Sequence, residues 1–266
     1  DVYKRQLQYC CLTMAANIFQ HVAEAAEILD GQDWLLVGGA MTQVHCVLGE
    51  VTYERPTSDV DIVVDPVRDS TLIGVAACLE KNGFERVDQL HSSGALHRFE
   101  RENGFAIDVM GKDSNLTPDR WLGFRVVKCP GSKSALGRYS DGKQKEILEV
   151  DVGEGRSVRI PNVWSALAIK GWALRQPDAN RQRHVQDSLA LLACASVTEP
   201  KRNLTKSERK AINFVLSSDY LSHMENWGPL SDRHWQAVLT EIRRLRPQGE
   251  IGVPDPLKPM LPPPKL

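Results

Sequence analysis

The hydrophobic and polar residues of the first 110 positions follow two different patterns. Some stretches repeat their apolar residues every three or four positions, which is the spacing of a helix, and short continuous apolar runs separate them. Helices are therefore predicted at residues 15–29, 40–48 and 69–81. Strands are predicted at residues 34–37, 59–64, 96–101 and 105–110. The Asn103-Gly104 pair joins the last two strands and favours a hairpin turn.

The second half has a mainly helical pattern. Between positions 111 and 155 the sequence shows little periodicity, and alternation predicts short strands only at 147–150 and 157–160. Pro161 suits the first turn of a helix, and apolar residues continue at helical spacing after it. The predicted helices cover residues 161–176, 181–195, 206–216 and 231–245.

These elements predict an α+β protein, with a mixed sheet flanked by helices and followed by a helical C-terminal domain. The sheet domain is expected at 14–160, the helical domain at 161–250 and a proline-rich extended tail at 251–266. The segment Asp1–Gln6, DVYKRQ, resembles the translation of a transposon end used in sequencing-library preparation. Residues 1–13 are therefore expected to be a non-native leader.

Composition narrows the class of protein only slightly. The chain of 266 residues has 33 basic and 34 acidic residues, which excludes a polycation but leaves room for a local basic groove. The uncharged stretch 34–49 contains polar residues and is shorter than the ~20 apolar residues of a membrane-spanning helix. The six cysteines are scattered without metal-ligand spacing, so we interpret them as reduced thiols of a cytoplasmic protein without a membrane partner.

Three aspartates are candidate metal ligands. Asp59 and Asp61 lie two apart in one strand, so both side chains point to the same face. Asp108 interrupts an apolar strand, where an unpaired carboxylate is costly and a cation would stabilise it. Carboxylate oxygens suit Mg²⁺, and an aspartate pair at a strand end suits a nucleoside triphosphate site. The structural alternative is an acidic pair at an exposed sheet edge, with Asp108 far from Asp59 and Asp61.

The Gly38-Gly39 pair follows the first strand and precedes a helix. Glycines at such a turn let backbone N–H groups and the N-terminus of the helix approach a triphosphate. A tight packing turn is the alternative interpretation. Arg55, Thr57 and Ser58 precede the aspartates, where a guanidinium and hydroxyls are suited to bind phosphate oxygens.

The segment LLVGGAMTQVHCVLGEVTYERPTSDVDIVV carries this glycine turn and the D-x-D pair, and a third aspartate follows one strand later. This order resembles the DNA polymerase β-like nucleotidyltransferase superfamily. The form Arg55-x-Thr57-x-Asp59-x-Asp61 most resembles the AbiEii/AbiGii-type toxins of bacterial type IV toxin–antitoxin systems. The resemblance covers about residues 29–192 and implies a polymerase β-like fold.

The resemblance also extends to two helices beyond the sheet domain. LAIKGWALR contains Lys170, and RQRHVQDSLALL contains Arg183, His184 and Asp187. Family members often have Lys-Asp-x-x-Asp where this chain has Arg183-His184-x-x-Asp187, so only Asp187 is matched. The resemblance implies that Lys170 binds the triphosphate and that Asp187 orients this lysine or the acceptor.

These helical residues also have simpler interpretations. Arg183 and Asp187 are four apart, which fits a surface ion pair. Arg175 lies about 140° around the helix from Lys170, so the two cannot bind one phosphate from a straight helix. His91 and His97 lie near the expected hairpin and are candidates to contact an acceptor, although isolated histidines are more often structural or solvated.

The implied activity is nucleotidyl transfer of EC 2.7.7 type, with an NTP as substrate and two Mg²⁺ ions held by Asp59, Asp61 and Asp108. The resemblance implies an RNA acceptor, with tRNA 3′ ends as the leading candidate, and a winged-helix antitoxin as partner. Transfer to a small molecule such as an aminoglycoside, transfer to a protein hydroxyl, and phosphorylation are alternative activities. A catalytically inactive nucleotide-binding module is an alternative of a different class.

Overall fold

The structure is a computed structural model, and it describes residues 15–53, 55–64, 72–87, 95–96, 98–121, 124–137, 147–153, 155–177, 180–198, 204–217, 230 and 232–245. The predicted leader at 1–13, the predicted tail at 251–266, His91 and His97 lie outside these residues.

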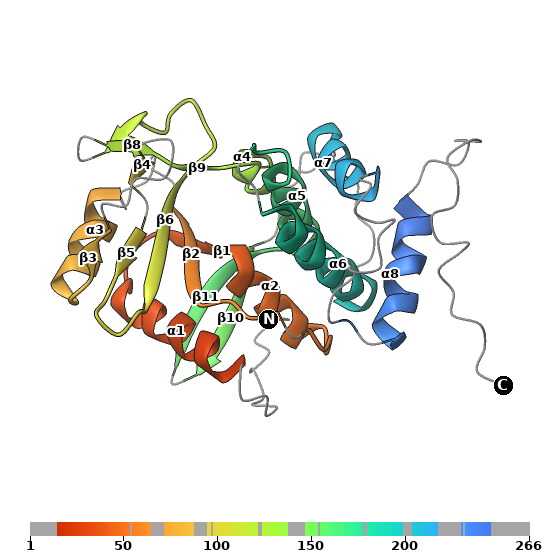
Figure 1. The fold of residues 1–266 in the computed structure, drawn as a ribbon, viewed down its shortest axis with the longest axis horizontal. Coiled ribbons are helices and arrows are strands. Elements are labelled where there is room, and N and C mark those ends of the chain that lie inside the picture. Colours follow the sequence, from red (N-terminus) through yellow and green to blue (C-terminus); the bar gives the residue numbers. More distant parts are fainter. Residues whose placement is uncertain are drawn as a thin grey trace.

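A mixed sheet forms the first half of the molecule (Figure 1). Strand β2 runs antiparallel to β1 on one side and parallel to β6 on the other. Strand β5 continues the sheet antiparallel to β6, β3 follows it, and β9 pairs with the end of β6. The strands are β1 (Trp34–Val37), β2 (Asp59–Val64), β6 (Ala106–Lys112), β5 (Arg98–Glu100), β3 (Glu85–Arg86) and β9 (Lys128–Cys129).

The strand pairing brings the predicted aspartates together at the middle of the sheet. Asp61 on β2 is the register partner of Asp108 on β6, and Asp59 pairs with Ala106. Strand β2 lies between β1 and β6 rather than at an edge. The structural alternative, an exposed edge pair with Asp108 far away, is therefore wrong.

Two smaller β units and four helices complete the first half of the described chain, and the shortest of these helices contacts helices of the second half. A hairpin of β10 (Ile147–Gly153) and β11 (Arg156–Pro161) packs against β1 and α1. The other unit is a three-stranded sheet in the order β4 (Ala95–Leu96), β8 (Phe124–Val126) and β7 (Arg120–Trp121). The helices are α1 (Ala15–Ile28), α2 (Gly38–Leu48), α3 (Leu72–Lys81) and the short α4 (Ser132–Ala135).

Four helices form the second half of the described chain (Figure 1): α5 (Val163–Ala173), α6 (Arg181–Thr198), α7 (Lys206–Ser217) and α8 (Asp232–Leu245). Helix α5 packs between α6 and α7, and α6 also contacts α2 and α8. Gly171 permits the close approach of α5 and α7, because a Cβ there would lie 2.4 Å from the carbonyl oxygen of Ala211.

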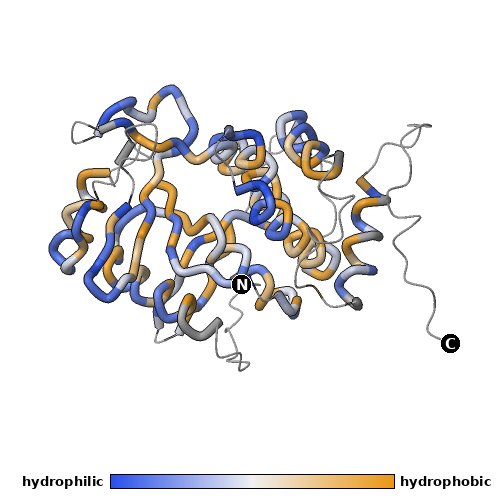
Figure 2. The backbone as a smooth tube through the Cα atoms, in the orientation of Figure 1, coloured by the Kyte–Doolittle hydropathy of each residue, from blue (hydrophilic) through white to orange (hydrophobic). Residues whose placement is uncertain are grey.

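A continuous apolar core connects the strands to the helices. Val60 and Ile62 on β2, Met41 on α2 and Trp164 on α5 have no measurable exposure. Figure 2 shows hydrophobic segments along the central strands and along α5 and α6. In the described part of the chain, no helix is long and apolar enough to span a bilayer.

Several element boundaries differ from the sequence-based predictions. Helix α2 begins at Gly38 rather than at residue 40, because the glycine turn itself is the first turn of the helix. Pro161 ends β11 instead of opening α5, and the Asn162 side chain caps α5 by accepting a hydrogen bond of 2.9 Å from the backbone N–H of Ser165. The region after residue 111 holds β7, β8, β9 and α4, which are too short to produce a periodic pattern.

Candidate functional site

Three carboxylates gather where β2 and β6 lie side by side. Asp59 and Asp61 point to one face of β2, while Val60 and Ile62 between and after them are buried on the other. Asp108 lies beside Asp61 on the neighbouring strand and is 6% exposed. Asp61 and Asp108 are 47 residues apart in the chain, so only the long-range pairing of β2 with β6 brings them together.

Arg98 on β5 bridges two of these carboxylates. Its Nε and Nη2 atoms donate to the two oxygens of Asp108, each over 2.8 Å, and Nη2 also donates to Asp59 over 3.0 Å. Hydrogen bonding to Asp108 is the main cause that raises the pKa of Arg98 above its ordinary value. A positive charge therefore lies between Asp59 and Asp108.

Asp61 is the carboxylate with the least favourable electrostatic surroundings. Burial raises its pKa to about 7, and the nearby charges of Asp108 and Asp59 add to this shift. Lys170 and a hydrogen bond from the backbone N–H of Gly39 act in the opposite direction. A bound cation would relieve the repulsion among these like charges.

The glycine turn lies directly against this carboxylate. A Cβ at Gly38, where φ is +68°, would lie 1.8 Å from an oxygen of Asp61 and 2.6 Å from its Cβ. A Cβ at Gly39 would lie 2.6 Å from Arg55 Nη2 and 2.7 Å from Thr57 Oγ1. Both glycines are needed because the turn, the aspartates and the Arg55 loop meet at one point. The packing interpretation and a phosphate-binding turn are compatible here.

The residues of the loop before β2 differ in their contacts with the site. The Thr57 hydroxyl donates to Asp59 over 3.2 Å, so it orients a carboxylate. Ser58 is exposed, and its side chain has no hydrogen bond with any described residue. The Gln43 side chain on α2 donates to the carbonyl oxygen of Arg55 over 2.8 Å and fixes the loop to this helix.

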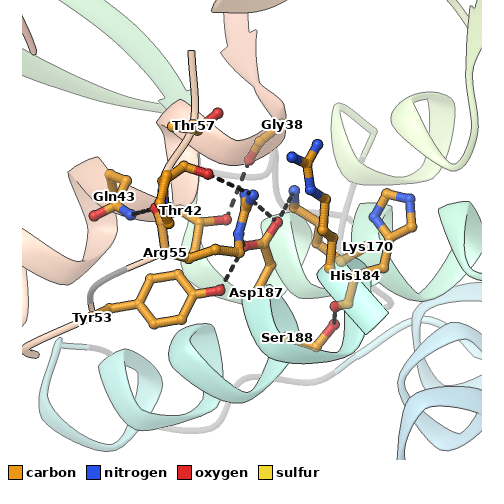
Figure 3. Close-up of polar contacts among 12 residues, drawn as sticks. Gly38, Thr42, Gln43, Tyr53, Arg55, Thr57, Lys170, His184, Asp187 and Ser188 are labelled. Atoms are coloured by element: carbon orange, nitrogen blue, oxygen red, sulfur yellow. Dashed lines mark hydrogen bonds and ion pairs between the residues drawn. The ribbon is translucent and has the colours of Figure 1, made fainter. Parts of the chain in front are cut away.

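Asp187 is the centre of a second polar cluster, formed with Tyr53, Arg55 and Lys170 (Figure 3). Its carboxylate accepts hydrogen bonds from the Tyr53 hydroxyl over 2.9 Å, from Arg55 Nε over 2.8 Å and from Lys170 Nζ over 2.6 Å. Asp187 and Lys170 are 1% and 3% exposed. Residues from the β2 loop, α5 and α6 therefore meet at one buried carboxylate.

Burial alone would raise the pKa of Asp187. The positive charges of Lys170 and Arg55 and their hydrogen bonds have the larger combined effect and hold this pKa below its ordinary value. Burial also lowers the pKa of His184 to about 4, with Lys170 as the next cause. The cluster thus holds a carboxylate anion and two cations, and the nearby His184 imidazole is neutral.

The cluster changes the interpretation of two predicted residues. The suggested surface pair between Arg183 and Asp187 is wrong, because Asp187 is buried and bound by Lys170 and Arg55 while Arg183 is exposed. Lys170 donates to Asp187, as expected for an aspartate that orients this lysine.

The three carboxylates have the ligand chemistry of a magnesium site but not, as they stand, its geometry. Carboxylate oxygens on adjacent strands are the hard ligands that Mg²⁺ prefers, and Arg98 already provides a positive charge between two of them. Within the described residues, no group of three or more His, Cys, Asp or Glu side chains is arranged closely enough to hold a metal ion. Arg98 would have to move for Asp59 and Asp108 to bind one.

Sequence reasoning missed Arg98 and Tyr53. The hairpin around Asn103-Gly104 places Arg98 opposite Asp108. The predicted turn therefore contained enough information to identify Arg98 as the cross-strand neighbour of Asp108. Tyr53 carries no such signal, because its partner Asp187 is 134 residues further along the chain.

No protein-family model matches this chain, and comparisons with curated proteins and with solved structures also give no match.

A pair of glycine substitutions tests whether the turn is built around Asp61. Both Gly31 and Gly38 have positive φ, of +73° and +68°, but a Cβ at Gly31 meets nothing within 4 Å. Gly31→Ala and Gly38→Ala should therefore share the ~1–2 kcal/mol cost of a left-handed residue. In urea unfolding, the free energy of unfolding of Gly38→Ala should fall by about 2 kcal/mol more than that of Gly31→Ala, because the new Cβ overlaps Asp61. Equal losses in the two variants would contradict this close approach.

Proposed function

We propose that this chain is a magnesium-dependent nucleotidyltransferase of the polymerase β-like class, which moves a nucleoside monophosphate from an NTP to an acceptor hydroxyl. The observation that carries the proposal is the register pairing of Asp61 with Asp108 on interior strands, with Asp59 on the same face and the glycine turn against Asp61. Carboxylates on such a face suit divalent cations and a triphosphate.

The nucleotide would lie at the N-terminus of α2. Gly38 and Gly39 present backbone rather than side chains, and the positive end of the helix dipole favours the triphosphate. Arg55, Thr57 and Ser58 border this turn, and Ser58 is exposed and available to a ligand. Lys170 would contribute positive charge from the far side, held in place by Asp187.

Asp59, Asp61 and Asp108 would hold the two magnesium ions. When bound, these ions would polarise the α-phosphate and neutralise charge on the triphosphate. Asp108 lies on the far side of Asp61 from the glycine turn and would favour deprotonation of the acceptor hydroxyl. A bond forms between the acceptor oxygen and the α-phosphorus, the bond to the β-phosphate oxygen breaks, and pyrophosphate leaves.

We further propose an RNA acceptor and a toxin role in a bacterial toxin–antitoxin pair. The support is the resemblance of the Arg55-x-Thr57-x-Asp59-x-Asp61 form to AbiEii-type toxins, together with Lys170 and Asp187. A winged-helix antitoxin would be the partner. Small-molecule and protein hydroxyls are alternative acceptors, and an inactive nucleotide-binding module is the alternative without chemistry.

Transfer of label from the α-phosphate tests the activity. The purified chain is incubated with Mg²⁺, each α-labelled NTP and total bacterial RNA, an aminoglycoside or a protein mixture in turn. Label should move to RNA, and Asp61→Asn should reduce this transfer by ~10²-fold or more, since the ions supply several kcal/mol of transition-state stabilisation.

Asp30→Asn is the matched control, because Asp30 is an exposed aspartate outside the site, and it should transfer at the wild-type rate. Asp61→Asn should remain folded in a melting experiment, because it removes like-charge repulsion. Wild-type transfer by a folded Asp61→Asn variant would contradict the proposal, and label on an amino sugar alone would contradict the RNA acceptor.

Arg98 gives an independent test through metal binding. Because its guanidinium bridges Asp59 and Asp108, a metal ion has to displace it. Arg98→Gln should therefore raise the Mg²⁺ affinity measured by calorimetry about 3- to 30-fold, as expected for losing charge-assisted bonds that are partly exposed. Arg86→Gln, which removes an exposed pair with Glu80, should leave the affinity unchanged. Weaker Mg²⁺ binding by Arg98→Gln would show that the guanidinium supports the metal site instead.

A further inference from the structure

A second polar surface lies where the end of α5 meets α7, away from the three carboxylates. It is a groove of about 590 Å³, lined by Arg175, Lys206, Arg209, Lys210, Asn213 and Phe214, and we name it the α5–α7 groove. Five of these residues come from α7, at positions spaced three or four apart, so they form one face of the helix. In Figure 1 this helix lies on the outer side of α5.

The groove concentrates positive charge. Four of its six lining residues are cations, and all four are exposed. None of them forms an ion pair with a carboxylate among the described residues. The acid on the same helix, Glu208, is fully buried and accepts hydrogen bonds from Thr205, so it does not neutralise the groove.

Aromatic rings and a backbone carbonyl hold part of this charge in place. The Arg175 guanidinium lies 5.0 Å from the ring centre of Trp172 and 5.7 Å from that of Phe214. Arg209 Nε donates to the carbonyl oxygen of Leu204 over 3.2 Å. Phe214 is 38% exposed, although most of the large apolar side chains that the structure describes are buried. The groove therefore presents fixed cations beside an accessible aromatic ring.

We propose that the α5–α7 groove binds a single-stranded nucleic acid, with the cations on its phosphates and a base stacked on Phe214. Phosphate-binding cations combined with a stacking ring are the usual elements of single-strand recognition. A duplex hides the faces of its bases, so it cannot use the ring. A membrane surface fits less well, because Phe214 is the sole large apolar side chain among the six lining residues.

The groove is also a candidate binding site for the acceptor strand. This role rests on the proposed function. Lys170 lies on α5, and Arg175 lies in the groove, two residues beyond the end of that helix at Ala173. A strand held in the groove would therefore lie at the C-terminal end of α5, the helix that carries Lys170.

Fluorescence anisotropy with labelled oligonucleotides of 12 nucleotides, at about 50 to 200 mM salt, tests the groove on the full chain. The wild-type chain should bind single-stranded RNA or DNA, and comparing the two strands shows whether the sugar matters. Lys206→Gln/Lys210→Gln should weaken binding about tenfold or more and lower the slope of log affinity against log salt by ~1.4, which is ~0.7 for each lost phosphate contact. Phe214→Leu should weaken binding about tenfold with an unchanged slope.

Lys81→Gln/Arg125→Gln is the matched control, since it also removes two exposed cations but from α3 and β8, and it should bind as the wild type does. Unchanged binding by the Lys206→Gln/Lys210→Gln variant would overturn the proposal. Equal or tighter binding of duplex RNA or polyglutamate would also overturn it, because neither can use the stacking ring.

The experiments distinguish a failure of the groove proposal from a failure of the proposed function. Asp61→Asn should bind strands like the wild type, because Asp61 lies outside the groove. A chain that binds strands through the groove but makes no labelled product would contradict the proposed function alone. A chain that makes labelled product while the groove variants keep full strand affinity would contradict the groove alone.

Discussion

The Asp187 carboxylate is the buried charge on which the arrangement of the two polar clusters depends. It lies on α6 and is bound by Lys170 from α5 and by Tyr53 and Arg55 from the segment before β2. Removing one partner of such a buried pair typically costs ~3–5 kcal/mol, because the remaining charge is left without compensation. The cluster therefore fixes the helices against the sheet, and it fixes Lys170 at the position from which it acts on Asp61.

Near the Asp187 cluster, the carboxylates of the site outnumber the cation that binds them. Three carboxylates occupy one face of β2 and β6, with Arg98 between two of them, and a glycine turn removes any side chain from the approach to Asp61. Like charges this close favour a cation, and the N-terminus of α2 favours an anion. A magnesium–triphosphate complex satisfies both requirements, which is the physical basis of the proposed nucleotidyl transfer.

The long helices and strands could be predicted from the sequence, because their residues are buried at regular intervals. The three aspartates could be singled out as candidate site residues, because a carboxylate in an apolar strand is costly. The hairpin at Asn103-Gly104 accounts for the position of Arg98 opposite Asp108, whereas the register of Asp61 with Asp108 comes from the parallel pairing of β2 with β6, which no turn determines. The short strands β7, β8 and β9 could not be predicted, because two or three residues carry no period. The position of Asp187 was ambiguous for a different reason: spacing along a helix identifies Arg183 as a neighbour, but burial against Tyr53 and Arg55 is decided by contacts more than 130 residues apart.

We propose that the three carboxylates and the glycine turn form one site for a magnesium–triphosphate complex. A crystal structure of the chain with Mg²⁺ and an NTP analogue that has a non-cleavable α–β linkage tests it most directly. We predict metal density within ~2.0–2.1 Å of oxygens of Asp59 and Asp61, the triphosphate at the N-terminus of α2, and Arg98 displaced from Asp59. A triphosphate bound elsewhere, or one bound while Arg98 still bridges Asp59 and Asp108 without metal, would contradict the claim.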